Sequence, residues 1–262
     1  MADFDISVIV PNYNYGRFLA TTLNSIRAQT LKPREIIVVD DGSNDMSVNL
    51  VRDQFPEIKL VAQENKGVNA ARNHGIKLAK GKFIALCDSD DLWLPEKLEK
   101  QIQLFAKPKT ILVGSHIKEF GENARGSTEY AKFRGDLSQK YKRFPGTAWI
   151  PGTCSSSLFL RSVALDIGLF DENLRGSAED WEFFARLAIQ GDFDFVDEVL
   201  VKIRKHGSAR SKISTRVWYR DNRKALRQFS ARSPNFRFHE KFLASLYLVR
   251  VFVKAIVRNV IS

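Results

Sequence analysis

The 262-residue sequence is poor in cysteine and has no glycine-rich nucleotide-binding loop. Its two cysteines, Cys87 and Cys154, cannot form the disulfide framework that staples small secreted domains. Residues 11–16 read Pro-Asn-Tyr-Asn-Tyr-Gly, with one glycine where a dinucleotide-binding turn needs three. No Gly-x-x-x-x-Gly-Lys-Ser/Thr segment occurs, which excludes the usual P-loop kinases and ATPases. A bound diphosphate would therefore need side chains and a cation.

A basic leader and a long uncharged apolar run are also absent. Residues 1–5 lack the basic start of a signal peptide, so we expect a cytoplasmic protein. The formal net charge is +11, which would ordinarily suggest nucleic acid as a partner. Residues 216–262 contain eleven Lys or Arg and two carboxylates, so +9 of this charge lies there. The excess charge thus belongs to a C-terminal appendage.

Strand and helix patterns alternate along the first hundred residues. Apolar, β-branched segments predict strands at 6–10, 35–39, 58–61 and 83–87. Helical spacing of apolar residues follows at 17–29, 46–54 and 68–80. This alternation predicts an α/β fold with a mostly parallel sheet flanked by helices.

The pattern is weaker after residue 110. Residues 121–153 have no clear period and predict a long functional loop region. More regular structure is expected as a strand at 111–113, a short helix at 163–167, a helix at 180–190, a strand at 199–203 and a helix at 242–261. The second half is therefore predicted to build a different surface.

Carboxylates directly follow two of the predicted strands. The strand at 83–87 leads into Asp88-Ser89-Asp90-Asp91, and the strand at 35–39 leads into Asp40-Asp41. Open α/β sheets bind ligands at the carboxyl ends of their strands. Crowded carboxylates repel one another unless a cation such as Mg²⁺ neutralises them. The cluster suggests a metal-diphosphate site, with a helix cap and solvated carboxylates as the alternative.

Four segments occur in a fixed order: Ser-Val-Ile-Val-Pro-Asn-Tyr-Asn at 7–14, Val-Val-Asp-Asp-Gly-Ser at 38–43, Asn-Lys-Gly-Val-Asn-Ala-Ala-Arg-Asn-His-Gly-Ile at 65–76 and Asp-Ser-Asp-Asp at 88–91. Together they resemble the signature of family 2 glycosyltransferases with the GT-A nucleotide-sugar fold. The resemblance implies a GT-A domain over residues 1–215, with a nucleotide-binding half to about residue 105 and an acceptor half over 106–215. Residues 216–262 are expected as a basic amphipathic helical tail.

The resemblance also implies which residues bind the nucleotide. An aromatic ring at Tyr13 would stack on the base, and Asp41, rather than Asp40, would bind the base edge. Arg72 would lie near the phosphates or pair with the acidic clusters, and the two roles are compatible. The full set of matching positions is Pro11, Tyr13, Asp41, Asn65, Gly67, Arg72, Asp88 and Ser89.

Metal and catalytic positions are carried over in the same way. Asp90 matches a ligand of Mn²⁺ or Mg²⁺, and Asp91 matches a second ligand or a helix cap. His206 follows Arg-Lys and resembles a histidine that approaches the metal or diphosphate, although a lone histidine is usually a polar surface residue. Asp180, with Glu179 before it, matches the catalytic base; an acidic pair at a helix start is also a common cap.

The expected function is an inverting, metal-dependent transfer of one sugar from a UDP-sugar. The acceptor would be a glycan or a lipid-linked glycan in cell-envelope polysaccharide synthesis. No Gln-x-x-Arg-Trp motif of the processive synthases occurs, which favours transfer of a single sugar. A sugar-phosphate nucleotidyltransferase is the alternative, but it needs a glycine-rich basic loop. A nucleic-acid-binding module rests only on the charge of the tail, so no nucleic-acid partner is expected.

The tail itself predicts a contact with a membrane. Arg250, Lys254 and Arg258 recur every four residues and interrupt the apolar run before it reaches the length of a spanning helix. An interfacial helix on an anionic surface, at the cytosolic face of the inner membrane, fits this pattern. The alternative is packing of the helix on the domain or on a second subunit, which would give a homodimer.

Overall fold

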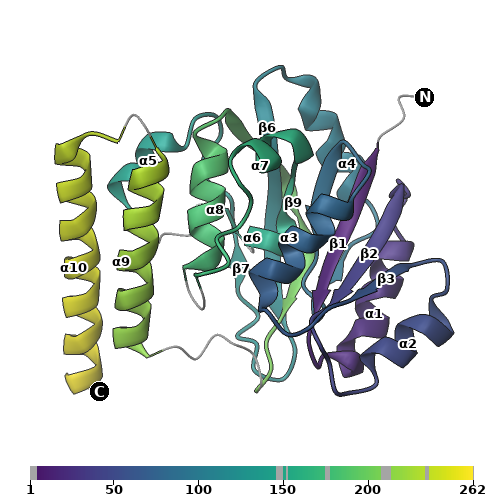
Figure 1. Ribbon diagram of the computed structural model, residues 1–262. Coiled ribbons are helices and arrows are strands. Elements are labelled where there is room, and N and C mark those ends of the chain that lie inside the picture. Colours follow the sequence, from purple (N-terminus) through teal and green to yellow (C-terminus); the bar gives the residue numbers. More distant parts are fainter. Residues whose placement is uncertain are drawn as a thin grey trace.

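The computed structural model describes residues 5–145, 150–151, 153–174, 178–207, 214–233 and 236–261; side chains are described to residue 253, Thr153 excepted. These residues form a single mixed sheet with helices on both faces (Figure 1). The strand order is β3-β2-β1-β4-β8-β6-β9-β5, with β7 paired to β6. Its strands are β1 (Ile6–Asn12), β2 (Glu35–Asp40), β3 (Lys59–Ala62), β4 (Phe83–Leu86), β5 (Leu92–Trp93), β6 (Thr110–Phe120), β7 (Thr128–Glu129), β8 (Leu158–Leu160) and β9 (Asp192–Arg204).

The N-terminal half has the predicted alternation of strands and helices. Strands β3, β2, β1 and β4 are parallel neighbours. The helices between them are α1 (Gly16–Arg27), α2 (Ser47–Gln54) and α3 (Val68–Leu78). Parallel strands joined in this way bring all their carboxyl ends to one edge of the sheet. The predicted α/β fold is confirmed, and the residues after β1, β2 and β4 lie at that edge.

Side chains of β1 alternate between two hydrophobic clusters, one on each face of the sheet. Ile6, Val8 and Val10 pack with α1 on one face, and Ile9 packs with α3 on the other. Helix α3 lies so close that a Cβ atom at Gly75 would be 2.4 Å from the Ile9 side chain. Glycine at this position therefore allows α3 to approach the sheet.

The second half departs from the parallel pattern at β8. This strand is antiparallel to both β4 and β6, while β6 and β9 are parallel. Its direction follows from α6 (Thr153–Ser156), because Ser155 Oγ of this helix accepts a 3.0 Å hydrogen bond from the Asp88 amide at the carboxyl edge. Strand β8 thus starts at that edge and runs back from it.

Several further elements were only partly predicted. Strands β6 and β9 are longer than the predicted 111–113 and 199–203, because they pair with each other over most of their length. Residues 121–153, expected as a loop, include β7 and the short helix α5 (Ser138–Arg143). Helix α5 has only six residues, which is too short to show a hydrophobic period. The predicted helix at 163–167 is α7 (Arg161–Asp166).

Helix α4 (Lys97–Gln103) buries an amine beside the sheet. The Lys97 Nζ atom lies 4.0 Å from the centre of the Trp93 ring and donates a 2.8 Å hydrogen bond to Gln101 Oε1. Burial lowers the pKa of Lys97 to about 7. The 3₁₀ helix η1 (Leu104–Ala106) follows and leads into β6.

The described part of the predicted tail consists mainly of two helices, α9 (Thr215–Arg232) and α10 (Phe238–Ile261), at one side of the molecule (Figure 1). Helix α9 packs on α8 (Glu179–Ala188), where the Trp181 indole donates a 2.8 Å hydrogen bond to Asn222. Ala244 and Leu248 of α10 join the same hydrophobic cluster. The inner faces of both helices therefore pack on the domain. No described helix is both long enough and apolar enough to cross a membrane.

Candidate active site

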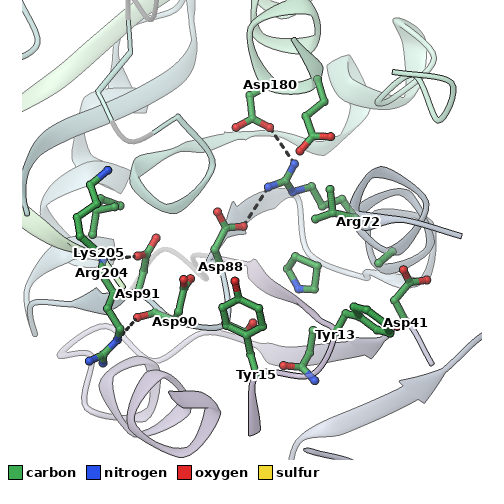
Figure 2. A pocket seen from close by; sticks show the side chains of 17 residues that line it. Tyr13, Tyr15, Asp41, Arg72, Asp88, Asp90, Asp91, Asp180, Arg204 and Lys205 are labelled. Atoms are coloured by element: carbon green, nitrogen blue, oxygen red, sulfur yellow. Dashed lines mark hydrogen bonds and ion pairs between the residues drawn. The ribbon is translucent and has the colours of Figure 1, made fainter. Parts of the chain in front are cut away.

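A pocket of about 290 Å³ opens at the carboxyl edge of the sheet (Figure 2). Its walls come from the ends of β1, β2, β4 and β9 and from the first turns of α3 and α8. Of the residues predicted for the site, those that line the pocket are Pro11, Tyr13, Asp41, Arg72, Asp88, Ser89, Asp90, Asp91, Glu179 and Asp180. Asn65, Gly67 and His206 lie outside its lining.

Arg72 joins two acidic segments that are far apart in the sequence. Its Nη1 atom lies 2.8 Å from Asp180 Oδ1, and its Nη2 atom lies 3.0 Å from Asp88 Oδ1 (Figure 2). The guanidinium is buried, whereas both carboxylates are partly exposed. Burial alone would lower the pKa of Arg72, but the charges of Asp180 and Asp88 contribute to raising it well above the usual value, so the group stays cationic. One cation therefore holds the predicted base beside the acidic cluster.

Asp41 is fixed by the loop that precedes α3. Its Oδ1 atom accepts hydrogen bonds from Gln63 Nε2 at 2.8 Å and from the Lys66 amide at 2.9 Å, and its Oδ2 atom accepts one from the Gly67 amide at 2.8 Å. Gly67 has a φ of 95°, in the left-handed region that favours glycine. Gln63, Lys66 and Gly67 thus hold Asp41 in place, and Asn65 lies in the same loop.

Asp40 is bound away from the pocket. Its Oδ2 atom accepts a 2.9 Å hydrogen bond from Asn12 Nδ2, and its Oδ1 atom accepts one of 2.8 Å from the Ser43 amide. These bonds close the turn after β2 against the end of β1. Asp40 thus has a structural role here, and its neighbour Asp41 faces the pocket.

Asp90 and His206 form a pair at the rim of the pocket. His206 Nε2 lies 2.9 Å from Asp90 Oδ2, and the imidazole is buried against the rings of Tyr15 and Phe18. Burial raises the pKa of Asp90, and the charge of Asp88 raises it further. This corner of the site therefore carries crowded negative charge that a cation would relieve.

Asp91 is buried and both of its oxygens are engaged by the protein. Ser155 Oγ donates a 2.6 Å hydrogen bond to Oδ2, and the Arg204 amide donates one of 2.9 Å to Oδ1. Burial, followed by the charges of Asp90 and Asp88, raises the pKa of Asp91 well above its usual value. Asp91 thus ties the acidic cluster to α6 and to the end of β9.

The predicted base lies in the first turn of α8. The N-cap residue of this helix is Ala178, and it makes no side-chain capping bond. Glu179 and Asp180 are the first two residues of the helix, where its dipole favours negative charge. The Cys154 thiol lies 3.5 Å from Asp180, and burial raises the pKa of that thiol well above its usual value. Cys154 therefore remains a thiol and donates its hydrogen to Asp180 Oδ1.

Sequence reasoning missed several polar residues of this region. Tyr15, Arg204 and Lys205 line the pocket, and Ser155 supports it from below. Arg204 and Lys205 directly precede His206 in the sequence, and the motif around this histidine therefore already indicated them. Ser155 lies in a run of three serines with no motif of its own.

No group of three or more His, Cys, Asp or Glu side chains within the described part of the chain is arranged to hold a metal ion. Mg²⁺ usually keeps several waters and binds through one or two carboxylates plus substrate phosphates. The oxygen atoms of Asp90 and the neighbouring acidic cluster fit this mode of binding. A small number of protein ligands is therefore compatible with a metal ion whose coordination shell is completed by the diphosphate of the donor.

Known proteins resemble this chain in sequence and in fold. The family model described as glycosyl transferase family 2 matches residues 7–168. An uncharacterised glycosyltransferase of Nostoc is 36% identical over an alignment of 166 positions, which covers 60% of this chain and 51% of that protein. The uncharacterised glycosyltransferase YwdF of Bacillus subtilis is 33% identical over an alignment of 196 positions, which covers 70% of this chain and 68% of that protein.

Two solved structures show the same fold at low sequence identity. S. aureus TarS, in complex with UDP-GlcNAc, gives a TM-score of 0.71 at 22% identity and covers 95% of this chain and 73% of that one. The mannosyltransferase PcManGT of Pyrobaculum calidifontis, in complex with GDP-Man and Mn²⁺, gives a TM-score of 0.61 at 19% identity. The match covers 98% of this chain and 75% of that one.

The fold and the pocket define a GT-A-type α/β protein with its site at the carboxyl edge of the sheet. Since the family model covers more than half of the sequence, the chain belongs to glycosyl transferase family 2. It spans between half and two thirds of the length of the first curated relatives. Asp180 and His206 lie beyond the matched residues 7–168, so their roles depend on the geometry of the site.

Proposed function

We propose that this protein is an inverting, metal-dependent glycosyltransferase that moves one sugar from a nucleotide-diphosphate donor, a UDP-sugar, to an acceptor hydroxyl. The observation that carries the proposal is the arrangement around Arg72, which brings Asp180 of α8 into one pocket with the acidic cluster after β4. The nucleotide-sugar complexes of TarS and PcManGT support the donor class. The resemblance of the four sequence motifs to family 2 glycosyltransferases favours UDP over GDP as the nucleotide.

The base and ribose would bind along the ends of β1 and β2. Tyr13 is 40% exposed at the pocket, so its ring is accessible to a nucleobase. The oxygens of Asp41, beside Pro11, are already oriented by the loop at residues 63–67 and could accept a hydrogen bond from the base edge. Asp88 and Ser89, which also line the pocket, would lie beside the ribose. A preformed cradle of this kind lowers the ordering cost of binding.

The diphosphate would lie over the acidic cluster. Asp90 would hold the metal, with His206 and Asp91 as the other predicted ligands, and Mn²⁺ or Mg²⁺ would neutralise the diphosphate oxygens when bound. Arg72 and Lys205 would add positive charge from the walls of the pocket. Because both Asp91 oxygens already accept protein hydrogen bonds, Asp90 is the first choice among the ligands.

Asp180 would act as the general base. It would accept the proton of the acceptor hydroxyl while the hydroxyl oxygen bonds to the anomeric carbon and the bond to the diphosphate breaks. A single carboxylate on the side opposite the leaving group suffices for such a direct displacement, which inverts the anomeric configuration. Arg72 would keep Asp180 oriented until the acceptor arrives. Glu179 is the neighbouring candidate for this role.

For the acceptor, we propose a glycan or a lipid-linked glycan of the cell envelope. The basic C-terminal helices support work at the cytosolic face of a membrane, because their charge would attract anionic lipids. The protein would then be peripheral to that membrane.

The donor proposal can be tested by thermal stabilisation with a panel of nucleotide sugars, with and without Mn²⁺. UDP-sugars should raise the Tm in the presence of Mn²⁺, since a ligand that binds only the folded state stabilises it. Asp90→Asn should abolish the Mn²⁺-dependent part of the shift. Asp53→Asn is a matched control, because this aspartate is exposed on α2 and outside the pocket. The absence of any nucleotide-sugar shift in the unaltered protein would contradict the proposal.

A further inference from the structure

An apolar stripe runs along the outer face of α10, away from the pocket. Its described members are spaced three or four residues apart and are between 43% and 86% exposed: Phe238, Phe242, Leu246, Val249 and Val253. Side chains at this spacing lie on one side of a helix. The other side of α10 carries Ala244 and Leu248, which are buried in the domain core. Helix α10 thus has two apolar faces, and the described residues cover only the inner one.

This outer face is too extended to be a scatter of single exposed residues. From Phe238 to Val253 the helix rises about 22 Å at 1.5 Å per residue. Scattered apolar side chains are normal on protein surfaces, whereas a continuous exposed apolar surface marks an interaction site. In Figure 1, α10 is the outermost helix, with α9 as its neighbour on the inner side. A large partner can therefore reach it.

The exposed charges of the two helices have one sign. Cations are exposed at Arg216, Arg220, Arg223, Arg227, Arg237, Lys241 and Arg250. Residues 216–262 contain two carboxylates, and the protein already engages both. Asp221 lies 3.0 Å from the Arg220 guanidinium, while Glu240 lies 3.6 Å from Lys142 and accepts a 2.7 Å hydrogen bond from the Arg237 amide. Within its described residues, the helix pair therefore has an apolar stripe on α10, exposed cations on both helices and no free acid.

We infer that the outer face of α10 docks on an anionic lipid surface. A second copy of the chain would bring two helix pairs of the same charge together, with no free carboxylate in their described parts to pair with the cations. An anionic leaflet meets both features, since apolar side chains enter the boundary of headgroups and acyl chains while cations contact the headgroups. The inference rests on the peripheral membrane contact of the proposed function, is independent of sugar transfer, and assigns that contact to one face of one helix.

Point substitutions test this face better than removal of the tail. Truncation before α10 would take Ala244 and Leu248 out of the core and would disturb the fold. Phe242→Ser with Leu246→Ser alters exposed side chains only. Met46→Ser with Leu165→Ser is a matched control, because these apolar residues are 62% and 38% exposed outside α10.

The 262-residue chain and its variants would be sedimented with vesicles of phosphatidylcholine, with or without phosphatidylglycerol. We expect the unaltered chain and the control to sediment with the anionic vesicles and much less with the neutral ones. The Phe242/Leu246 variant should lose about tenfold or more in partitioning, because it removes apolar contact. Arg250→Gln should lose about fivefold, which corresponds to about 1 kcal/mol per cation.

Several results would overturn the inference. One is equal sedimentation of the Phe242/Leu246 variant and the unaltered chain, and another is a failure of the unaltered chain to sediment with anionic vesicles. A dimer seen by light scattering without vesicles, and dissociated by the same variant, would assign the face to a second copy. Arg250→Gln still tests the inference if the double variant loses stability. The donor-dependent Tm shift, measured in each variant, separates failure of docking from failure of the proposed activity.

Discussion

Replacement of Asp180 by asparagine separates its proposed role as a base from its bond to Arg72. An asparagine oxygen can still accept the 2.8 Å hydrogen bond from Arg72 Nη1, whereas an amide cannot take up the proton of an acceptor hydroxyl. Loss of a general base lowers a rate by about 10² to 10⁴. At about 1.36 kcal/mol for each factor of ten, the barrier should rise by about 2.7 to 5.4 kcal/mol.

The folded state should change far less than the rate. Asp180 is 30% exposed, so water screens its attraction to the buried Arg72. Loss of that charge should cost at most about 1 kcal/mol of unfolding free energy. In a chain of this size, such a loss lowers the Tm by about 3 °C. A large fall in turnover with a small fall in Tm is therefore the expected signature of Asp180→Asn.

Calorimetry and UDP release measure the two sides of this prediction. Donor affinity would be determined with a UDP-sugar and Mn²⁺, and it should stay within about twofold of the unaltered value, since a base acts in the transition state. UDP release can be followed with water in place of the acceptor, because hydrolysis needs the same proton acceptor. Glu179→Gln and Asp53→Asn serve as the neighbouring and remote controls.

Two results would refute this reasoning about Asp180. If UDP release continues near the original rate, another group is the base, and Glu179→Gln shows whether the neighbouring carboxylate has that role. If donor affinity falls in step with turnover, Asp180 acts by positioning Arg72 at the donor and does not act as a base.

Three further predictions concern the metal, the support of the acidic cluster and a buried amine. Asp90→Asn should remove the Mn²⁺-dependent part of donor binding in calorimetry, and unchanged affinity would contradict its role as a ligand. Ser155→Ala should weaken Mn²⁺-dependent donor binding about tenfold, because it removes the hydrogen bond that holds Asp91. Ser157→Ala is the control: the Ser157 hydroxyl donates to the backbone of the nearby Cys154, so its loss should affect only the Tm. The unfolded chain keeps the proton on Lys97 up to about pH 10.5 while the folded chain releases it near pH 7, so stability should rise with pH between these values. Lys97→Met should flatten this rise and raise the Tm at pH 6 by about 5 °C, and a lower Tm at pH 6 would contradict it.

Much of the site could be read from the sequence because its parts are local. Apolar β-branched runs form the buried parallel strands, and each of these runs ends where polar residues begin. Parallel strands then bring their carboxyl ends together, so Asp41 and the cluster at 88–91 had to lie at one edge. The order of the four motifs indicated the family for the same reason.

The sequence left open the partners that are distant along the chain. Arg72 could have bound phosphate or paired with acids, and the structure pairs it with Asp88 and Asp180, which are 16 and 108 residues away. Ser155 gave no signal, since its role depends on α6 reaching the acidic cluster from another part of the chain. Such contacts depend on the docking of whole elements, which local propensity does not encode.

The C-terminal helices show the same division between sequence and tertiary structure. Composition and spacing determined that residues 216–262 are basic and that 242–261 can form an amphipathic helix. The apolar side chains alone could not show which face packs on the domain, because burial depends on what the opposing surface offers. Tertiary packing covers Ala244 and Leu248 and leaves Phe242 and Leu246 exposed. The sequence thus determined an apolar, basic helix, and only the fold decided which face remains for a partner.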